Sequence, residues 1–599
     1  MTCGTRLTDE LQSRKRPYPR NFAGNVRHRA YMQQISETDL EYRAYVIEAC
    51  RRDVLAFMDL FCVTKDPRRV PDVLPWISYD FQLGAVRDIE AAIDTGEDLL
   101  IDKSRDMGAS WMVLYVLLHK WLFESGSDIR IGSRKEEFVD KPKIIDTLFE
   151  KLRFTLEHLP YWLMPEGFDW KKHSTFMKLY NPKLGNTIVG ESANPSFGSG
   201  GRSKAILLDE FAKWDDSIAI AAWTSTADVT KCRLAVSTPV GSGNKFAQLA
   251  LGTGEETIKR ISLHWTLHPH KAKDAYYLDG AGTWIPVQSP EQAFKLWNQG
   301  VKVRSPWYDA EANRRSIADL AQEVDIDYLQ SGSPFFDIPA LKLQKVWKHR
   351  KSKIQGEPIP WGYHIKTVIL DVNGQITMRE DDQNGWLRVY ERPDKHCQYA
   401  IGADTAEGLA KGDECFLVVR DKYTRNVVAV FNGLIDPGEF GYRLWLVHRY
   451  YNNAVTAPEN NNHGYTTCYE FDKYGGHLYF TRPETQGATQ SIAAKRGWTT
   501  TAKTRPYMLN QLGTEIRTRF FEIRDDVLIK QCLTFVRNEK HSGKPEADGI
   551  LKDDGVIALA ISSAVILEQP YKATKATRRV QRATVEDVRN KHRNAGIGY

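Results

Sequence analysis

The sequence predicts an α/β protein made of two domains, and three observations lead to this prediction. In the first half, short apolar runs typical of buried strands alternate with helical patterns, which indicates a parallel-rich sheet covered on both faces. The second half has its own set of strands and helices. Between the two, residues 341–365 are charged and contain Pro and Gly, as domain linkers do.

The length of 599 residues leaves room for two domains and extensions at both ends. We expect an N-terminal extension at 1–50, a first domain at 51–340, the linker at 341–365, a second domain at 366–570 and a basic tail at 571–599. The basic residues of both ends are candidates for contact with DNA or an acidic partner. The alternative is that both ends are solvated segments without a partner.

The composition is that of a globular protein, with 42% hydrophobic and 26% charged residues. A net charge of +6 is compatible with nucleic-acid binding but does not require it. The eight cysteines include no C-x-x-C pair, which favours reduced thiols in a cytosolic protein over a disulfide or zinc framework. We find no signal peptide and no apolar run long enough to span a bilayer, so no membrane partner is expected.

The first domain is organised around residues 98–123. An apolar run at 98–102 predicts a buried strand, residues 103–110 a loop, and residues 111–123 an apolar, mostly buried helix. Backbone N–H groups at a helix N-terminus after such a loop point at an anion, and the helix dipole adds to the attraction. The stretch therefore predicts a phosphate-binding loop.

The loop departs from the usual pattern G-x-x-x-x-G-K-[ST]. Gly108 and Ser110 occupy the second glycine and hydroxyl positions, but Ala109 stands at the lysine position and Lys103 at the first glycine. A lysine at position 103 can still reach bound phosphates with its long stem, and Arg105 offers a second cation. The alternative is an ordinary strand-to-helix turn with solvated charges.

A second apolar run, Lys204–Leu208, ends in the acids Asp209 and Glu210. An Asp at a strand end can hold Mg²⁺, and an adjacent Glu can orient an attacking water. Alone, the pair could be two solvated acids. Together with the loop, it favours a site that binds ATP with Mg²⁺ and hydrolyses it, within a P-loop domain of the ASCE type.

Three further features of the first domain fit such a site. Gln82, in an aromatic stretch just upstream of the loop, could read adenine, unless these aromatic residues only begin a core helix. Arg202 follows a flexible Gly- and Ser-containing stretch and could reach a neighbouring subunit's nucleotide, unless it is an ordinary surface arginine. Ser237 and Thr238 end another strand, where they could sense the γ-phosphate.

The second domain carries acids in three distant segments. Asp404 lies in a strand that starts a hairpin, which is how an RNase H-like fold begins, Glu459 ends a later strand, and Asp553 and Asp554 begin an apolar helix. Carboxylates are hard oxygen ligands for Mg²⁺ or Mn²⁺, and such metals activate water and stabilise the leaving oxygen of a phosphodiester. Any single acid could simply end a strand or favour a helix dipole. Together they predict an RNase H-like nuclease.

The order of these motifs resembles the large subunit of tailed-bacteriophage terminases, over roughly residues 50–570. The most specific pieces are the segments Gly402–Asp413, Glu459–Gly464 and Gly497–Thr500. The resemblance implies an ATPase that drives double-stranded DNA into a procapsid and a nuclease that cuts concatemeric DNA. It also implies a portal protein, a terminase small subunit and a homo-oligomeric, pentameric ring as partners, and action in the host cytoplasm during virus assembly rather than presence in the mature virion.

The resemblance also gives each matching position a role. Gln82 would read adenine, Lys103 would be a displaced loop lysine, Arg105 the loop arginine, Glu210 the catalytic carboxylate, and Ser237 and Thr238 the coupling motif. Arg202 would contact a neighbouring subunit's nucleotide. The other residues expected to contact the nucleotide are Ser104, Asp106, Met107, Gly108, Ala109 and Ser110. Those expected to contact metal are Ser110, Asp209, Asp404, Glu459, Asp553 and Asp554. Asp404, Glu459 and Asp554 would form the nuclease triad, with Asp553 and Asp413 as nearby candidates.

Two other interpretations remain open. The first is another ATP-dependent DNA enzyme such as a helicase-nuclease, although the sequence shows no second helicase motor domain. The second is a non-catalytic DNA-binding scaffold with degenerate motifs, which Ala109 favours and the intact acids oppose.

Overall fold

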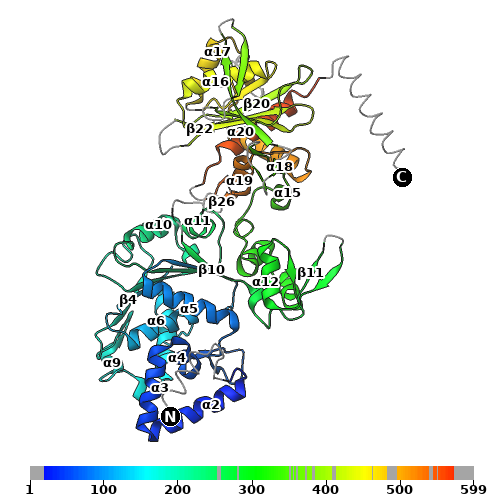
Figure 1. The fold of residues 1–599 in the computed structure, drawn as a ribbon. Helices are drawn as coiled ribbons and strands as arrows, with labels where there is room; N and C mark the ends of the chain where they lie inside the picture. Colours follow the sequence, from blue (N-terminus) through cyan, green and yellow to red (C-terminus); the bar gives the residue numbers. More distant parts are fainter. Residues whose placement is uncertain are drawn as a thin grey trace. The chain divides into compact units, whose positions relative to one another are not determined.

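The computed structural model of the protein divides into two compact units, Met1–Gly332 and Ser333–Tyr599. Figure 1 shows both, and each is described by itself. The described residues are 19–252, 256, 258–279, 282–349, 353–354, 357–358, 362–371, 374–380, 385–407, 413–461, 463–481, 495–538, 544–548 and 551–572. Most of the predicted tail at 571–599 and the basic run near residue 15 therefore lie outside the described residues.

The division between the units precedes the predicted linker at 341–365. The backbone N–H of Phe335 donates to the carbonyl of Phe535, and that of Trp347 donates to the carbonyl of Arg524. These contacts attach the chain from Ser333 onward to the second unit, although residues up to 340 were expected in the first.

The first unit contains an eight-stranded sheet in the order β10-β3-β9-β8-β4-β7-β6-β5. The pairs from β10 to β7 are parallel, and β6 and β5 extend the sheet as an antiparallel edge. The strands are β3 (Leu99–Lys103), β4 (Ile129–Ser133), β5 (Ser174–Thr175), β6 (Lys178–Tyr180), β7 (Thr187–Ser192), β8 (Ala205–Asp209), β9 (Arg233–Ser237) and β10 (Lys259–Leu263). The parallel pairs confirm the predicted parallel-rich α/β fold. Strand β9 lies between β3, which precedes the phosphate loop, and β8, which ends in the acids.

Helices pack against this sheet. They are α5 (Asp80–Thr95), α6 (Ala109–Phe123), α7 (Glu136–Val139), α8 (Leu148–Glu157), α9 (Trp170–His173), α10 (Asp216–Ser225) and α11 (Lys245–Leu251). Helix α6 is buried over nearly its whole length, as its apolar sequence predicts. Gly96 caps the C-terminus of α5 with a φ of 73°, a left-handed conformation that glycine adopts without strain. The chain then enters β3.

The described part of the expected N-terminal extension is helical and packs on the first unit. It forms α2 (Phe22–Thr38) and α3 (Leu40–Arg52), followed by α4 (Val54–Phe61) and the short hairpin of β1 (Val63–Lys65) and β2 (Val73–Pro75). Arg29 is buried and donates to the carbonyls of Cys62 and Trp76 at 2.8 and 2.9 Å. These bonds join α2 to the chain that leads to α5.

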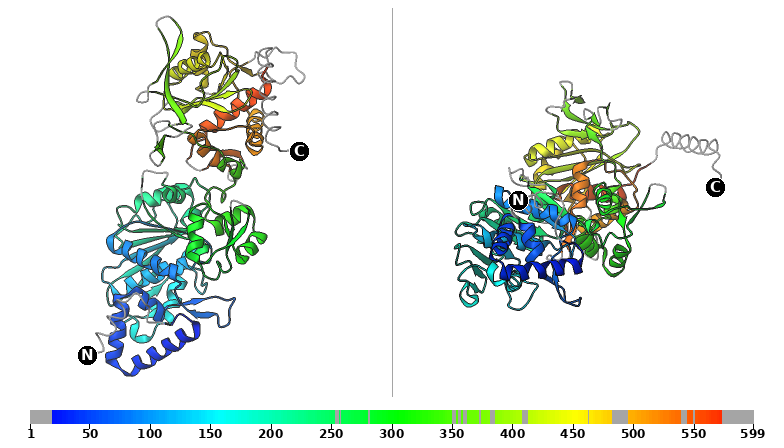
Figure 2. Two further views of the ribbon diagram at one scale, coloured as in Figure 1. Left: turned by 45° about the vertical axis from the view of Figure 1, so that its right-hand side comes forward. Right: turned by 60° about the horizontal axis from the view of Figure 1, so that its bottom comes forward.

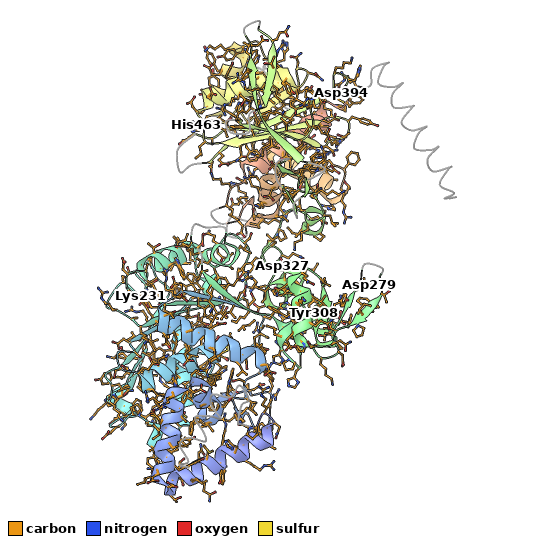
Figure 3. All side chains as sticks on the ribbon, in the orientation of Figure 1. Lys231, Asp279, Tyr308, Asp327, Asp394 and His463 are labelled. Atoms are coloured by element: carbon orange, nitrogen blue, oxygen red, sulfur yellow. The ribbon has the colours of Figure 1, made fainter. Side chains whose placement is uncertain are left out.

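The rest of the first unit is a smaller, Trp-containing cluster after β10. It contains β11 (Tyr276–Leu278), β12 (Trp284–Pro286), α12 (Pro290–Asn298), β13 (Val303–Arg304), α13 (Pro306–Arg314), α14 (Ile317–Leu320) and a π-helical turn at Ala321–Asp325. Tyr308, labelled in Figure 3, is buried in this cluster and donates to Asp325 at 3.1 Å. The π-helical turn places Glu323 next to the phosphate loop.

The second unit contains a mixed sheet in the order β14-β17-β19-β22-β21-β20-β23, with β18 paired to β17. The strands are β14 (Lys348–His349), β17 (Gly362–Leu370), β18 (Ile376–Glu380), β19 (Leu387–Val389), β20 (Tyr399–Asp404), β21 (Cys415–Asp421), β22 (Val427–Gly433) and β23 (Val455–Pro458). Strands β20, β21 and β22 form an antiparallel meander, and β23 adds parallel to β20. This is the strand arrangement of the predicted RNase H-like domain.

Helix α20 (Asp554–Glu568) crosses β20 in the second unit, as Figure 2 shows. A Cβ at Gly402 would lie 2.1 Å from the carbonyl oxygen of Ala558, so only glycine permits this approach. The remaining elements are α15 (Ile338–Lys342), α16 (Pro437–Tyr450), α17 (Gly464–Lys473), α18 (Thr504–Arg517), α19 (Asp526–Leu533), and the strand pairs β15–β16 (Lys353–Ile354, Glu357–Pro358), β24–β25 (Phe480–Thr481, Lys495–Arg496) and β26–β27 (Phe535–Asn538, Lys544–Ala547). None of the helices in the described ranges is long and apolar enough to cross a membrane.

Candidate active sites

The phosphate loop turns between β3 and α6 with two left-handed residues, Asp106 (φ 56°) and Gly108 (φ 75°). Gly108 also permits close packing, because a Cβ there would lie 2.9 Å from both the Gln82 amide nitrogen and the Trp76 ring. Helix α6 begins at Ala109, so its first N–H groups follow the loop. The local geometry is that of an anion-binding turn despite the altered sequence pattern.

Two of the residues expected to face nucleotide instead attach the loop to the π-helical turn. Ser104 is buried, donates its hydroxyl to the Val324 carbonyl at 2.6 Å and accepts from the Trp265 N–H at 3.0 Å. The Arg105 backbone N–H donates to the Glu323 carbonyl at 2.7 Å. The Arg105 guanidinium is open to solvent and lies 3.5 Å from the Glu323 carboxylate. Ser104 therefore holds the loop in place, whereas Arg105 still presents its cation.

The loop opens into a pocket of about 280 Å³. Its lining combines loop residues with charged side chains from other elements: Lys103, Arg105, Asp106, Met107, Gly108, Ala109, Ser110, Trp111, Lys151, Glu210, Lys213 and Glu323. Seven of the eight residues predicted at positions 103–110 line this pocket, all except Ser104.

The acidic pair at the end of β8 lies beside the loop. Ser110 donates to Asp209 at 3.3 Å, and Glu210 is held between Lys103 at 3.3 Å and Lys213 at 2.6 Å. Burial and the neighbouring Glu210 raise the pKa of Asp209 to about 6. Burial opposes ionisation of Glu210, but Lys103 and Lys213 outweigh it and lower the pKa of Glu210 to about 2. Glu210 is thus ionised and Asp209 is poised for a cation.

Lys103 is mostly buried, and its ammonium group lies 3.3 Å from the Glu210 carboxylate. Burial lowers the pKa of Lys103, but the carboxylates of Glu210 and Asp209 outweigh burial and raise it overall. The lysine therefore remains charged where the usual pattern has glycine, and it lies within reach of the pocket that the loop forms.

Sequence reasoning missed three charged residues of this pocket. Lys213 follows Glu210 by one short helical turn, a spacing that could have indicated the pair. Lys151 on α8 stacks over the Trp111 ring at 5.8 Å and donates to the Asp146 carbonyl at 2.6 Å. Glu323 lies 3.7 Å from Lys213. No local pattern marks Lys151 or Glu323, because both come from distant parts of the chain.

Gln82 is not free to face a ligand as expected. It is buried, its amide nitrogen donates to the Met107 carbonyl at 3.0 Å, and its amide oxygen accepts from the Tyr79 N–H at 2.9 Å. In this structure Gln82 joins α5 to the phosphate loop, and its adenine contact stays a prediction. Beside it, the rings of Tyr79 and Phe81 stack at 5.9 Å, and His268 lies 4.6 Å from Tyr79. Tyr79 and Phe81 also line a separate pocket of about 430 Å³.

The remaining predicted site residues of the first unit are Ser237 and Thr238 at the end of β9, and Arg202 in the loop before β8. Ser237 pairs with Asp102 across β9 and β3, and the hydroxyls of Ser237 and Thr238 are buried without a hydrogen-bond partner among the described residues. Arg202 is exposed, directly after Gly201 with φ 76°. Its predicted contact with a neighbouring subunit remains a prediction.

In the second unit, β20 and β23 bring two of the predicted acids together. The Ala403–Pro458 pairing places Asp404 and Glu459 side by side, and the Glu459 N–H donates to the Ala403 carbonyl at 2.8 Å. Burial raises the pKa of Asp404 well above its usual range, and the charge of Glu459 and a hydrogen bond to it add to the effect. A hydrogen bond between two carboxyls requires a proton on one of them.

The third acid comes from the start of α20. Asp554 is buried and accepts from the Glu414 N–H at 3.1 Å. Burial raises the pKa of Asp554 to about 7, with a further contribution from the charges of Asp413 and Asp553. Asp553 lies 3.4 Å from the guanidinium of Arg505 on α18. The two neighbours thus differ in partner: Asp554 lies with the acids, whereas Asp553 is paired with a cation.

The other sequence segments singled out in this unit surround these acids. The Trp498 N–H donates to the Pro458 carbonyl and the Asn460 N–H to the Trp498 carbonyl, both at 2.8 Å, so residues 497–500 lie alongside the end of β23. Exposed His463 lies 2.8 Å from Glu407. Gly408, Gly412 and Asn462 of these segments lie outside the described residues.

The donor sets fit divalent metal ions in their chemistry. Ser110 and Asp209 offer a hydroxyl and a carboxylate, and Asp404, Glu459 and Asp554 offer carboxylates alone, which are the hard oxygen ligands of Mg²⁺ and Mn²⁺. Raised pKa values mark acids that lack counter-charge, so a cation would be favourable there. Within the described ranges, no three His, Cys, Asp or Glu side chains are already arranged as a metal site.

Comparisons with known proteins give a likeness to one family. No family model and no curated protein matches the chain. Solved structures that match include the large terminase of bacteriophage HK97, at 13% identity over 86% of this chain and 99% of that chain, with a TM-score of 0.39. The large terminase of a thermophilic bacteriophage in complex with ADP matches at 9% identity over 82% and 100%, with a TM-score of 0.30.

A third match is the large terminase nuclease from thermophilic phage G20c with bound magnesium, at 15% identity over 39% of this chain and 97% of that chain, with a TM-score of 0.27. The three structures named here are large terminases. They are the family that the sequence motifs resemble. At these identities and TM-scores, the likeness gives no residue of this chain a role.

Proposed function

We propose that the chain is a terminase large subunit, a motor that moves double-stranded DNA into procapsids by ATP hydrolysis and cuts concatemeric DNA. The observation that carries the proposal is the pairing, in one chain, of two separate centres. In one unit the turn at residues 103–110 lies beside Asp209 and Glu210. In the other, Asp404 and Glu459 lie side by side, and the charge of Asp554 acts on Asp404. An ATPase or a nuclease alone would need only one of these centres.

In the first centre, the loop N–H groups with Lys103 would bind the phosphates of ATP, and Ser110 and Asp209 would hold Mg²⁺. When bound, this ion neutralises charge that develops on the phosphates. Because its pKa is about 2, Glu210 is a weak base, so we assign it the role of orienting water rather than removing a proton in advance. The aromatic group of Tyr79, Phe81 and His268 is the proposed adenine platform.

In the second centre, Asp404, Glu459 and Asp554 would hold Mg²⁺ or Mn²⁺, which would activate water and stabilise the leaving oxygen of the DNA backbone. Arg505 keeps Asp553 paired, so we assign Asp553 a supporting role and Asp554 a ligand role. The acids act on the backbone, so little sequence preference is expected.

The remaining assignments follow from the sequence resemblance. They are a homo-oligomeric, pentameric ring with Arg202 acting between subunits, docking on a portal protein, a small-subunit partner, and action in the host cytoplasm. The predicted domain bounds belong to the same proposal, with the first domain now taken to end at Gly332.

The test measures both activities on one preparation of the full chain. We expect DNA-stimulated ATP hydrolysis, and metal-dependent cleavage of plasmid DNA that continues without ATP. Glu210→Gln should remove only the first activity and Asp404→Asn only the second. A strand-separation assay addresses the helicase-nuclease alternative, and absence of both activities in the wild type would favour the scaffold alternative.

A further inference from the structure

A second pocket lies beside the acids of the second unit, next to α17. It has a volume of about 410 Å³ and is lined by Asn460, Asn461, Tyr465, Cys468, Tyr469 and Arg496. His463, two residues before Tyr465, does not line the pocket but is labelled in Figure 3. This volume lies within the range of small-molecule sites, and the residues that line it have no part in the chemistry proposed above.

Two tyrosine rings are the most unusual feature of this pocket. Tyr465 and Tyr469 are one helical turn apart on α17, so they lie on the same face, and they are 73% and 61% exposed. Aromatic side chains normally bury large areas, and exposed rings that border a pocket commonly mark a binding surface. Within the described residues, neither tyrosine stacks on another ring or forms a hydrogen bond through its side chain.

Two asparagines that line the pocket are held by hydrogen bonds. The Asn460 amide donates to the Arg496 carbonyl at 2.7 Å and to the Thr499 hydroxyl at 2.9 Å. The Asn461 amide donates to the Thr500 carbonyl at 3.0 Å and to the Glu459 carboxylate at 3.3 Å. These bonds use the amide nitrogens, and among the residues that the structure describes no donor is bonded to either amide oxygen, so both can accept from a ligand. Asn461 therefore links the pocket directly to a proposed metal ligand.

Arg496 supplies the positive charge at this pocket. Its guanidinium is exposed and paired with Asp472, and it is the charged residue among those lining the pocket. A guanidinium can bind a phosphate through two parallel hydrogen bonds, and it keeps its charge at any working pH. The tyrosine rings can stack on a base, the amide oxygens can accept from its exocyclic amino groups, and the guanidinium can bind its phosphate. Together these groups suit a nucleotide.

We propose that this pocket binds an unpaired nucleotide of the DNA strand held for cleavage. The proposal rests on the proposed nuclease function, because it takes the ligand to be the substrate of the adjacent acids. The base must be unpaired, since a tyrosine ring stacks on the face of a base and these faces are covered inside a duplex. Local fraying of the duplex at the cut site would supply such a nucleotide, and its capture would hold the backbone beside Glu459.

The experiment measures binding of the full chain to a short single-stranded oligonucleotide and to the duplex of the same sequence, in EDTA so that nothing is cleaved. Fluorescence anisotropy gives both dissociation constants. We expect Tyr465→Ala and Tyr469→Ala each to weaken binding of the single strand by about tenfold, the size of one lost stacking contact, and to change duplex binding little. Tyr465→Phe keeps the ring and should bind as the wild type does.

The control variant is Tyr423→Ala, whose ring is 58% exposed elsewhere in the same unit and lines no part of the pocket. It should change neither dissociation constant. Equal loss for single strand and duplex in the pocket variants would mean backbone contact without base capture and would overturn the proposal. Unchanged single-strand binding in both alanine variants would also overturn it.

Because these measurements need no cleavage, the pocket and the nuclease can fail separately. A wild type that shows the tyrosine-dependent binding but never cuts DNA would contradict the nuclease assignment and leave the pocket in place. A wild type that cuts DNA and binds single strands without any dependence on the tyrosines would contradict the pocket alone. Circular dichroism of each variant checks that α17 is intact.

Discussion

Glu210 of the first centre and the acids Asp404 and Asp554 of the second are buried in opposite ways. The first centre also contains one acid with a raised pKa, Asp209. In the first unit, the Glu210 carboxylate lies between Lys103 and Lys213, and its pKa falls to about 2. In the second unit, Asp404 and Glu459 face each other, the Asp554 pKa rises to about 7, and the nearby guanidinium of Arg505 is paired with Asp553. Like charges that lack counter-ions hold protons, whereas paired acids stay ionised.

This difference indicates where each centre obtains its positive charge. The first centre has lysines of its own and is already close to charge balance before any ligand binds. In the second, Lys552 and Arg505 lower the pKa values of Asp554 and Asp553, but they do not offset burial, and both pKa values stay raised. Cations from solution would therefore stabilise its acids. We therefore expect the second centre to be much more sensitive to metal removal and to the loss of any one acid.

The largest effect is expected from Asp404→Asn. Asp404 is buried beside Glu459 and within the field of Asp554, so its loss removes charge that would hold Mg²⁺ or Mn²⁺. We expect DNA cleavage to become undetectable while ATP hydrolysis is unchanged. The matched control is Glu439→Gln, an exposed acid of the same unit paired with Arg443. Metal-dependent cleavage at the wild-type rate in Asp404→Asn would exclude these acids as the nuclease centre.

Glu210→Gln should have the next largest effect. The amide cannot orient water as the carboxylate does, so ATP turnover should fall by roughly 10²–10⁴-fold while nucleotide binding persists. Turnover is measured by phosphate release and binding by a fluorescent nucleotide. Glu137→Gln, an exposed acid beside Lys135, is the control. If turnover stays near the wild-type rate, the acid that positions water lies elsewhere.

Lys103→Ala should lower ATP turnover by roughly 100-fold, because it removes the buried cation that stands in for the lysine missing at Ala109. Lys151→Ala should have a smaller effect, since Lys151 lines the same pocket from α8. Lys135→Ala is the exposed control. Lys120, on α6, is a poor control because it is buried against Asp94 and Glu124, so its loss would lower stability. Equal, small effects of Lys103→Ala and Lys135→Ala would make Arg105 the leading cation.

A smaller, thermodynamic effect is expected at Asp554. Its folded-state pKa of about 7 lies above the ordinary value, so the folded form binds the proton more tightly than the unfolded form. The resulting stabilisation is present below the unfolded pKa and is lost as the pH rises through about 7. Asp554→Asn avoids this loss. In EDTA, we expect the variant to exceed the wild type in free energy of unfolding by about 1–3 kcal/mol near pH 8 and by little near pH 4.5.

Urea unfolding at the two pH values measures this difference, and Glu439→Gln should show no such dependence on pH. A gain that is the same at both pH values would mean that Asp554 is strained by packing rather than by its buried charge. Either result measures how much folding free energy the second centre loses by burying acids without counter-ions.

The sequence predicted those parts of the two centres that depend on local order. The apolar runs before Lys103 and Asp209 are strands, and their parallel arrangement brings the loop and the acids to one edge of the sheet. Asp404 and Glu459 meet for the same reason, because Asp404 is the last residue of β20 and Glu459 directly follows β23, its parallel partner. An acid directly after a buried strand is therefore a reliable indicator of position.

Contacts between distant segments could not be predicted in this way. Ser104 bonds the π-helical turn, more than two hundred residues later, through its hydroxyl, and Arg105 bonds it through its backbone N–H. Gln82 is predicted to contact adenine because it lies next to aromatic residues, but the sequence did not indicate that its amide also bonds to the Met107 carbonyl of the loop. Lys151 lies on a helix whose sequence gives no sign of the pocket. In each case the residue that makes the contact lies far away in the chain, so no local sequence pattern indicates it.

Arg202→Ala should have the smallest effect on the isolated chain. Arg202 is exposed on its loop, and no contact with the Lys103–Glu210 pocket is seen within the described residues. We therefore expect unchanged ATP turnover in dilute protein and reduced turnover only in the assembled state, where the guanidinium would stabilise charge on a neighbour's nucleotide. Turnover measured against protein concentration separates the two states, and Arg134→Ala, another exposed arginine of the same unit, is the control. A concentration-independent loss would mean that Arg202 acts within its own subunit, and no loss at any concentration would remove it from the ATPase centre.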